Sequence, residues 1–166
     1  MSADNSMNTD KNISIKNKCV LAIATLFGVG YTPLMPGTAA CLVALLVAIL
    51  IRSQAWFIIV TVLSLVLAFY FSGRAENILG KKDAKEIVID DFSGMLITYI
   101  LIPYNIKFII VGFFLFRAFD MLKVPPANRV EKCKGALGIV GDDVVAGVYA
   151  NFILHIVNVL LRASAS

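Results

Sequence analysis

Residues 55–71 read AWFIIVTVLSLVLAFYF, and this stretch decides the fold. It carries no charged side chain, and it lacks the regular apolar–polar alternation of a half-buried β-strand. At about 1.5 Å per residue, a helix of this length approaches the ~30 Å thickness of the hydrocarbon core of a bilayer. The stretch therefore predicts a helix embedded in a membrane.

Similar apolar stretches occur along most of the chain. A short one comes first, at residues 19–27, and four others flank the stretch quoted above: 38–51, 92–102, 106–122 and 144–161. The shorter ones fall below the hydrocarbon thickness, so they need tilt or a locally thinned bilayer. We therefore expect an all-α fold, a polytopic membrane helical bundle with short helices and a re-entrant or interfacial N-terminal segment.

The composition agrees with a membrane protein. Hydrophobic residues make up 59% of the 166 residues and charged residues 16%, whereas ordinary soluble domains have about 45–50% and about 25%. We expect one membrane domain over residues 19–166. Residues 1–18 are expected to form a disordered polar tail, which lacks the apolar core of a signal peptide. The lipid bilayer is the expected partner.

The sequence gives no support to several other kinds of site. The formal charge is +4, and no zinc-finger spacing, basic helix or aromatic–basic sheet motif is present, so no nucleic-acid partner is expected. The cysteines at positions 19, 41 and 133 are too scattered for a disulfide framework or a zinc site. We interpret Cys41 as a packing residue and His155 as a hydrogen-bonded structural residue.

Proline, glycine and aspartate predict where the helices begin and end. Gly37-Thr38 after Pro36, and Asp142-Asp143 after Gly141, are predicted helix starts. Prolines at positions 103, 125 and 126 are predicted helix stops, and residues 72–86 are expected to form a polar connector.

The distribution of basic residues predicts the orientation of the helices. With a cytoplasmic N-terminus and a re-entrant or interfacial first stretch, eleven lysines and arginines lie on the cytoplasmic side: Lys11, Lys16, Lys18, Arg74, Lys81, Lys82, Lys85, Lys123, Arg129, Lys132 and Lys134. Only Arg52, Lys107 and Arg162 lie on the other side. Cytoplasmic segments of membrane proteins are enriched in Lys and Arg, so the rule supports this topology.

The same topology places five of the eight aspartates at one membrane depth: Asp90, Asp91, Asp120, Asp142 and Asp143. A carboxylate beside an apolar helix costs free energy unless it is paired or binds a cation, and converging carboxylates repel one another. A divalent cation removes both problems. Carboxylate ligands without His or Cys favour Mg²⁺, Mn²⁺ or Ca²⁺ over zinc. The five aspartates are therefore candidate metal ligands, and helix capping is the alternative for each one taken singly.

Two basic residues accompany the acidic ones. Arg117 lies three residues before Asp120, so the two share a helix face, and Lys123 lies a further turn along. An arginine suits planar recognition of phosphate, and the lysine could supply another phosphate contact. The alternatives are a buried ion pair for Arg117 and an exposed interfacial position for Lys123.

A loop rich in glycine and proline, residues 28–38, leads into an apolar stretch. Its glycines would let backbone N–H groups approach an anion, and a helix N-terminus adds a favourable dipole. Gly30, Pro36, Gly37 and Thr38 are therefore candidate substrate-binding residues. Elsewhere, glycines near the aspartates predict close helix approach, which would bring the carboxylates together.

Four ordered blocks of this sequence together resemble the phosphatidylglycerophosphatase A family. The blocks are FGVGYTPLMPGT at 27–38, IVIDDFSGM at 87–95, FRAFDMLK at 116–123 with Pro126, and GIVGDDVVAG at 138–147. The match runs from about residue 26 to residue 161, which is nearly the whole chain beyond the polar tail. The resemblance implies that residues 19–166 form a membrane phosphatase domain.

The resemblance further implies an Mg²⁺-dependent enzyme on the cytoplasmic face of the bacterial inner membrane. Its substrate would be the membrane phospholipid phosphatidylglycerophosphate, and its product phosphatidylglycerol. Family residues carry over onto Asp90, Asp120, Asp142 and Asp143. The departures are Asp91 where Glu is frequent, Val124 where Pro is common, and Ala39-Ala40 in place of a more glycine-containing step.

The expected chemistry is metal-assisted hydrolysis by water. The chain has no Cys-x5-Arg loop, no Asp-x-Asp pair and only one histidine, which excludes the usual covalent phosphatase machinery. Arg117 and Lys123 would offset charge on the phosphoryl oxygens, and Asp91 is a candidate general base. The alternatives are a divalent-cation transporter or channel, because intramembrane acids also mark ion pathways, and a structural membrane protein whose acids are caps.

Overall fold

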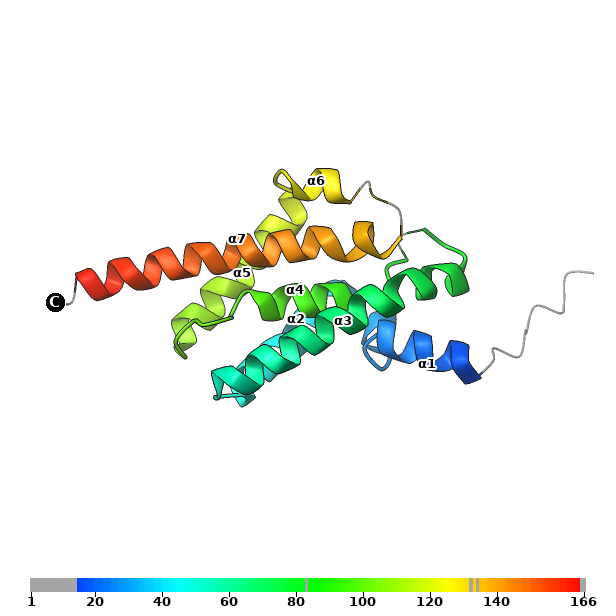
Figure 1. The fold of residues 1–166 in the computed structure, drawn as a ribbon, viewed down its shortest axis with the longest axis horizontal. Helices are drawn as coiled ribbons and strands as arrows, with labels where there is room; N and C mark the ends of the chain where they lie inside the picture. The colour runs from blue at the N-terminus through cyan, green and yellow to red at the C-terminus, as the bar shows by residue number, and fades with distance from the viewer. Residues whose placement is uncertain (1–14, 83, 132, 134, 165–166) are drawn as a thin grey trace, which may run out of the picture.

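The computed structural model describes residues 15–82, 84–131, 133 and 135–164, and no strand occurs among them. The helices are α1 (Ile15–Ala24), α2 (Pro36–Leu50), α3 (Gln54–Leu79), α4 (Ile89–Ile97), α5 (Ile106–Leu122), α6 (Ala127–Val130) and α7 (Ala136–Ala163), with a 3-10 turn η1 (Val29–Tyr31) after α1 (Figure 1). The expected all-α bundle is thus confirmed.

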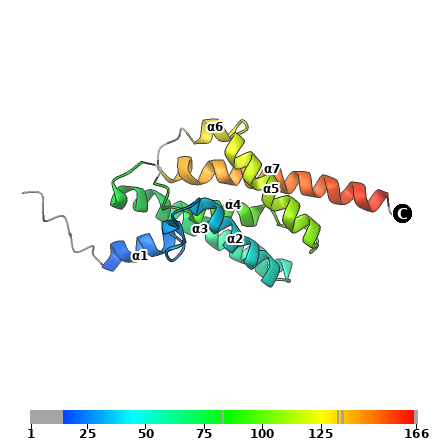
Figure 2. The same ribbon diagram turned by 180° about the vertical axis from the view of Figure 1, so that it is seen from behind.

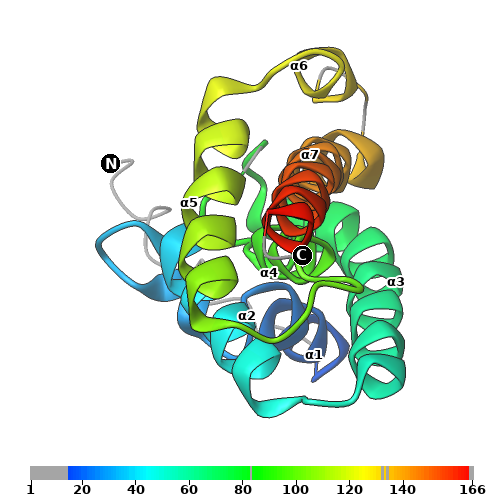
Figure 3. The same cartoon turned by 90° about the vertical axis from the view of Figure 1, so that its left-hand side faces the viewer.

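The short helix α4 forms the centre of the bundle. It contacts α2, α3, α5 and α7, which lie around it when the molecule is viewed end-on (Figure 3). Eight of its nine residues are buried, and Met95 and Leu96 are fully enclosed. Nine residues rise only about 14 Å, so α4 is too short to cross a bilayer alone and is instead shielded by its neighbours.

Two helices are long and apolar enough to cross a membrane. They are α3, with 26 residues, and α7, with 28, and only 28% and 22% of their most apolar windows are buried inside the protein. The outer faces of α2 and α5 also expose large apolar side chains, among them Leu46 and Phe114. In water such a surface would be unstable, so the fold indicates membrane association. The number of complete spans stays a prediction.

Successive helices run in opposite directions. Figure 1 shows α2, α3, α4, α5 and α7 alternating along the long axis of the molecule. As a result four segments lie at the same end of the bundle: the first turns of α2 and α4, the last turn of α5 and the first part of α7. This arrangement brings the singled-out segments of the sequence together.

Two predicted boundaries were wrong. The polar connector begins later than residue 72, because Ser72 and Ala75 are buried and α3 continues to Leu79, where Gly80 ends it in a left-handed conformation. The last helix begins at Ala136 rather than at Asp142. Helix α1 begins at Ile15, within the predicted tail, and its residues from Val20 onward pack in the second core cluster. Residues 1–14 of that tail lie outside the described residues.

Close contact between α4 and α7 depends on two glycines, as expected from the sequence. A Cβ atom added to Gly94 would lie 2.7 Å from the Asp143 carbonyl oxygen, and one added to Gly147 would lie 2.3 Å from the Gly94 carbonyl oxygen. Neither position has room for a larger residue, so the helix backbones touch here. This contact holds Asp143 beside the first turn of α4.

The remaining contacts agree with the simpler expectations. Cys41 is fully buried in the main core. The Nε2 atom of His155 lies 3.3 Å from the carbonyl oxygen of Ile100, consistent with a structural hydrogen bond. The helices that precede the predicted proline stops end at Ile97 and Leu122.

Candidate active site

A cleft of about 350 Å³ opens at the end of the bundle where the acidic segments meet. It is lined by ten of the eleven residues singled out from the sequence: Pro36, Gly37, Thr38, Asp90, Asp91, Arg117, Asp120, Lys123, Asp142 and Asp143. The exception is Gly30, which is buried against the backbone of Glu86, where an added Cβ would lie 2.0 Å from the carbonyl oxygen. The structure therefore gives Gly30 a packing contact outside the cleft.

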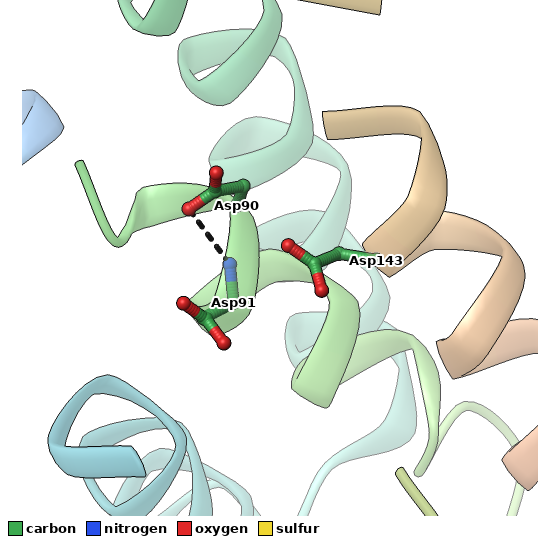
Figure 4. A group of neighbouring side chains, drawn as sticks. All are labelled: Asp90, Asp91 and Asp143. Atoms are coloured by element: carbon green, nitrogen blue, oxygen red, sulfur yellow. Dashed lines mark hydrogen bonds between the residues drawn. The ribbon is translucent and has the colours of Figure 1, made fainter. Parts of the chain in front are cut away.

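Three carboxylates converge in the cleft (Figure 4). Asp90, Asp91 and Asp143 each offer an oxygen, and these atoms all lie within 4.8 Å of one another. Asp90 and Asp143 are only 7% and 6% exposed. The Asp91 backbone N–H donates a 2.9 Å hydrogen bond to Asp90 Oδ1, which orients that side chain. The set combines the first turn of α4 with the second turn of α7.

The position of Asp143 excludes one alternative from the sequence. Since α7 begins at Ala136, with Gly135 before it, neither Asp142 nor Asp143 caps a helix. Asp90 and Asp91 do lie in the first turn of α4, but its N-cap is Val88. Capping therefore does not account for the buried carboxylate of Asp143.

Burial and mutual repulsion shift the acids of α4. Burial is the main cause that raises the pKa of Asp91 to about 7; the nearby Asp120 adds to the shift and Arg117 opposes it. Burial, and then the charge of Asp91, raise the pKa of Asp90 well above its usual range. The cluster is therefore short of positive charge, and a cation placed between the carboxylates would favour their ionised forms.

Arg117 bridges two of the acids. Its Nη1 atom donates to Asp91 Oδ1 at 2.9 Å and to Asp120 Oδ2 at 2.7 Å. All three side chains are between 17% and 19% exposed, so the pairs are poorly screened by water. The predicted pairing with Asp120 is present, and the structure adds Asp91 on a different helix. Arg117 thus links α5 to α4 within the lining of the cleft.

Lys123 faces a second acidic pair. In the left-handed position that ends α5, its Nζ atom lies 2.5 Å from Glu131 Oε1 and 3.5 Å from Asp142 Oδ2. Among the described residues, Asp142 Oδ1 is buried and has no hydrogen-bond partner. Asp120 and Asp142 thus line the cleft with a basic partner each, outside the group of three converging carboxylates.

The start of α2 completes the cleft. Proline at the first position and Met35 in a left-handed conformation begin the helix without a side-chain cap. The hydroxyl oxygen of Thr38 is buried and has no hydrogen-bond partner within the described part of the chain. The Asp91 carboxylate packs directly against the Cα of Gly37, because an added Cβ would lie 2.4 Å from Asp91 Oδ2.

Gly37→Ala should therefore disturb the cleft with little damage to the fold. The new methyl group would displace the Asp91 carboxylate, while alanine is a better helix former than glycine. We expect the phosphatase activity that the sequence resemblance implies to fall at least about tenfold, with the thermal midpoint in detergent unchanged or higher. Gly73→Ala is the matched control, because its Cβ would approach only Ala136, at 3.3 Å, away from the cleft. Equal activity of both variants would contradict the contact.

Sequence reasoning did not single out three residues at the site. Glu131 pairs with Lys123, Lys85 lines the cleft, and the thiol of Cys41 lies 3.9 Å from both Arg117 Nη1 and the Asp91 carbonyl oxygen. Cys41 and Glu131 gave no motif signal because each lies in a separate segment from its partners. Lys85 was counted only as a cytoplasmic basic residue.

Comparison with known proteins decides the family. The family model described as phosphatidylglycerophosphatase A matches residues 22–158. The chain belongs to the phosphatidylglycerophosphatase A family. It is therefore a phosphatase of lipid metabolism. The family resemblance predicted from the four sequence blocks is confirmed. No solved structure matches the chain.

Curated relatives of this family cover most of the chain. Phosphatidylglycerophosphatase A of Escherichia coli is 33% identical over 139 residues, spanning 81% of this chain and 81% of its own length. The protein of the same name from Haemophilus influenzae is 34% identical over 145 residues, spanning 84% and 88%. A Bacteroides thetaiotaomicron protein, provisionally named phosphatidylinositol-3-phosphatase, is 36% identical over 142 residues, spanning 80% and 88%.

Proposed function

We propose that this phosphatase hydrolyses phosphatidylglycerophosphate to phosphatidylglycerol and inorganic phosphate, using Mg²⁺, at the cytoplasmic face of the bacterial inner membrane. The observation that carries the proposal is the cleft itself, where three converging carboxylates lie beside Arg117 and Lys123. The names of two relatives support the substrate. The exposed apolar helices support a substrate that resides in a bilayer.

The donor set fits a hard divalent cation. Asp90, Asp91 and Asp143 offer only carboxylate oxygens, which Mg²⁺ prefers, and Asp142 has a buried oxygen without a partner among the described residues. Asp120 and Asp142, which line the same cleft, are the further candidates predicted from the sequence. When bound, Mg²⁺ would polarise the phosphate and lower the pKa of the attacking water.

The remaining groups of the cleft are suited to binding a phosphate monoester. Arg117 and Lys123 carry the positive charge that would offset the phosphoryl oxygens in the transition state. The backbone N–H groups of Gly37 and Thr38 at the start of α2 can donate to an anion. Asp91, which lies in the cleft beside Arg117, is the proposed general base for water.

Chelation provides the direct test of the metal. Purified protein in detergent should release phosphate from phosphatidylglycerophosphate, lose this activity in EDTA and regain it with excess Mg²⁺. The thermal midpoint should rise on addition of Mg²⁺ to the chelated protein, because the cation binds the folded state. Full activity after exhaustive chelation would refute the metal requirement while leaving the phosphatase assignment intact.

The substrate needs its own comparison. Because one relative carries a phosphatidylinositol-3-phosphatase name, phosphatidylinositol 3-phosphate is the matched competitor substrate. Both lipids should be presented at equal mole fraction in the same mixed micelles. We expect a higher kcat/KM for phosphatidylglycerophosphate. A preference for the inositol lipid would replace the proposed substrate with that of the other relative.

The alternative of a cation transporter or channel has no support from the structure or the relatives. A transporter is expected to hold its acids near the membrane midplane. Here the acids gather at one end of the bundle, together with basic residues. The relatives of this chain carry phosphatase names.

Cysteine labelling tests the proposed cytoplasmic orientation. Lys82→Cys, in the exposed connector near the cleft, should react with a membrane-impermeant reagent only from the cytoplasmic side. Ser53→Cys, in the exposed turn before α3 at the opposite end, should react only from the periplasmic side. Cys19 and Cys133 must be replaced first because they are exposed, whereas Cys41 is buried and can stay. The reverse pattern of labelling would overturn the orientation.

A further inference from the structure

Exposed apolar side chains border the cleft on both sides. We call four of them the apolar rim: Leu34, Met35, Met121 and Leu122. On one side the rim directly precedes Pro36 at the start of α2, and on the other it lies between Asp120 and Lys123 at the end of α5. These three neighbours line the cleft, so the rim lies at its mouth. Leu34 and Leu122 are 80% and 72% exposed.

The rim continues into two apolar stripes. On α2 the stripe consists of Leu42, Leu46 and Leu50, and on α5 of Ile106, Ile110 and Phe114, and all six are exposed. Residues spaced by four lie on one helix face, so each set forms a line along its helix. Helices α2 and α5 contact each other, and Figure 2 shows them on the same side of the molecule, running in opposite directions. Both stripes therefore lead away from the mouth of the cleft.

This surface has the polarity of a phospholipid laid along it. Arg117 and Lys123 in the cleft provide positive charge for a phosphate. Each stripe alone covers about 12 Å of its helix, and rim and stripe together form an apolar path along helices of 15 and 17 residues, about 22–25 Å long. One leaflet of the ~30 Å hydrocarbon core is shorter than this path, so acyl chains fit along it. A protein partner would not require the apolar path to begin at a phosphate site.

We propose that the apolar rim and the stripes of α2 and α5 bind the acyl chains of the lipid whose phosphate occupies the cleft. The substrate then enters sideways from the bilayer between the start of α2 and the end of α5, and the rim favours long-chain lipids over the same headgroup on short chains. This inference rests on the proposed function, and it adds where the lipid lies and what selects it.

The test compares two substrates that share one headgroup. Parent and Leu34→Gln/Leu122→Gln protein are assayed with long-chain phosphatidylglycerophosphate in mixed micelles and with its short-chain, water-soluble analogue. The double variant should lose at least about tenfold in kcat/KM on the long-chain lipid, because two apolar contacts with the chains become polar. Its kcat/KM on the short-chain analogue should stay near that of the parent.

The control places the same changes elsewhere on the apolar surface. Leu63 and Val66 are exposed on α3, which lies across the bundle from α5 in the end-on view (Figure 3). The Leu63→Gln/Val66→Gln variant should insert equally well and keep the ratio of long-chain to short-chain activity. If the rim variant folds poorly, Met121→Ala/Leu122→Ala removes apolar area without adding polar groups and should lower the same ratio.

The outcomes separate the two proposals. An unchanged ratio in the folded rim variants, or an equal loss in the α3 control, would overturn the acyl-chain site while the parent enzyme still hydrolyses the lipid. If the rim variant has a lower ratio of long-chain to short-chain activity and also changes from a dimer to a monomer, a second copy of the chain covers this face instead. A parent protein that releases phosphate from neither substrate would refute the proposed function itself.

Discussion

Asp143→Asn should insert and fold normally yet lose about 10²-fold or more of its phosphatase activity. The substitution keeps the size of the side chain and removes its negative charge. Asp143 is buried on α7, its carboxylate lies with those of Asp90 and Asp91, and no helix begins there for it to cap. The expected loss therefore reports on the charge that the cation requires.

The measurement is phosphate release from phosphatidylglycerophosphate at several Mg²⁺ concentrations, normalised to correctly inserted protein. A weakened metal site should show a higher Mg²⁺ requirement, with partial recovery at high concentration. Glu86→Gln is the matched control, since it also removes one negative charge but pairs with Lys81, at 3.6 Å, outside the cleft. Near-parental turnover of Asp143→Asn at limiting Mg²⁺ would refute the metal role of Asp143 and favour Asp90 and Asp142 as the ligands.

Arg117→Ala should lose both stability and activity. Without the guanidinium, Asp91 and Asp120 lose their shared partner in a site where each is less than a fifth exposed. Removing one partner of a buried ion pair costs about 3 kcal/mol or more, so the thermal midpoint in detergent should fall by several degrees. Activity should fall about 10²-fold, because the proposed phosphate contact is lost as well.

Arg117→Lys separates these two effects. Lysine keeps the positive charge and should recover much of the stability, but it lacks the planar fork and should leave activity reduced at least about tenfold. Arg74→Ala is the control, because Arg74 is exposed and contacts Tyr70 on its own helix. Parental activity in Arg117→Lys would show that the residue supplies only charge.

The sequence by itself predicted the all-α fold and ten of the residues that line the cleft. Long uncharged apolar runs have few stable alternatives to helices in a membrane, because every backbone polar group must be satisfied within the element. Short connections then force neighbouring helices to run in opposite directions. This alternation predicts that Asp90, Asp120 and Asp143 lie at one end of the bundle, and in the structure they line one cleft. The start of α2 was also predictable, because proline is favoured at the first helical position.

Only the tertiary structure decided where helices extend beyond their apolar runs. The polar residues after Phe71 predict a connector between helices. In the structure Ser72 and Ala75 are buried and continue the packed face of α3. The glycines before Asp142 predict that the helix begins after them. In the structure Gly138 and Gly141 lie within α7 and pack against the backbone of Cys133 and the side chain of Val130. Local composition does not show these packing contacts, so the predicted boundaries were misplaced at both helices.

The partners within the site were likewise decided by packing. Spacing along one helix predicted that Arg117 would meet Asp120, but its contact with Asp91 depends on how α5 docks beside α4. The pairing of Lys123 with Glu131 depends on the path of the chain after α5. Sequence patterns determine which residues share a helix face, because that geometry repeats along the chain. Contacts between helices depend on how the helices cross, and for α4 and α7 the crossing follows from the close approach of Gly94 and Gly147.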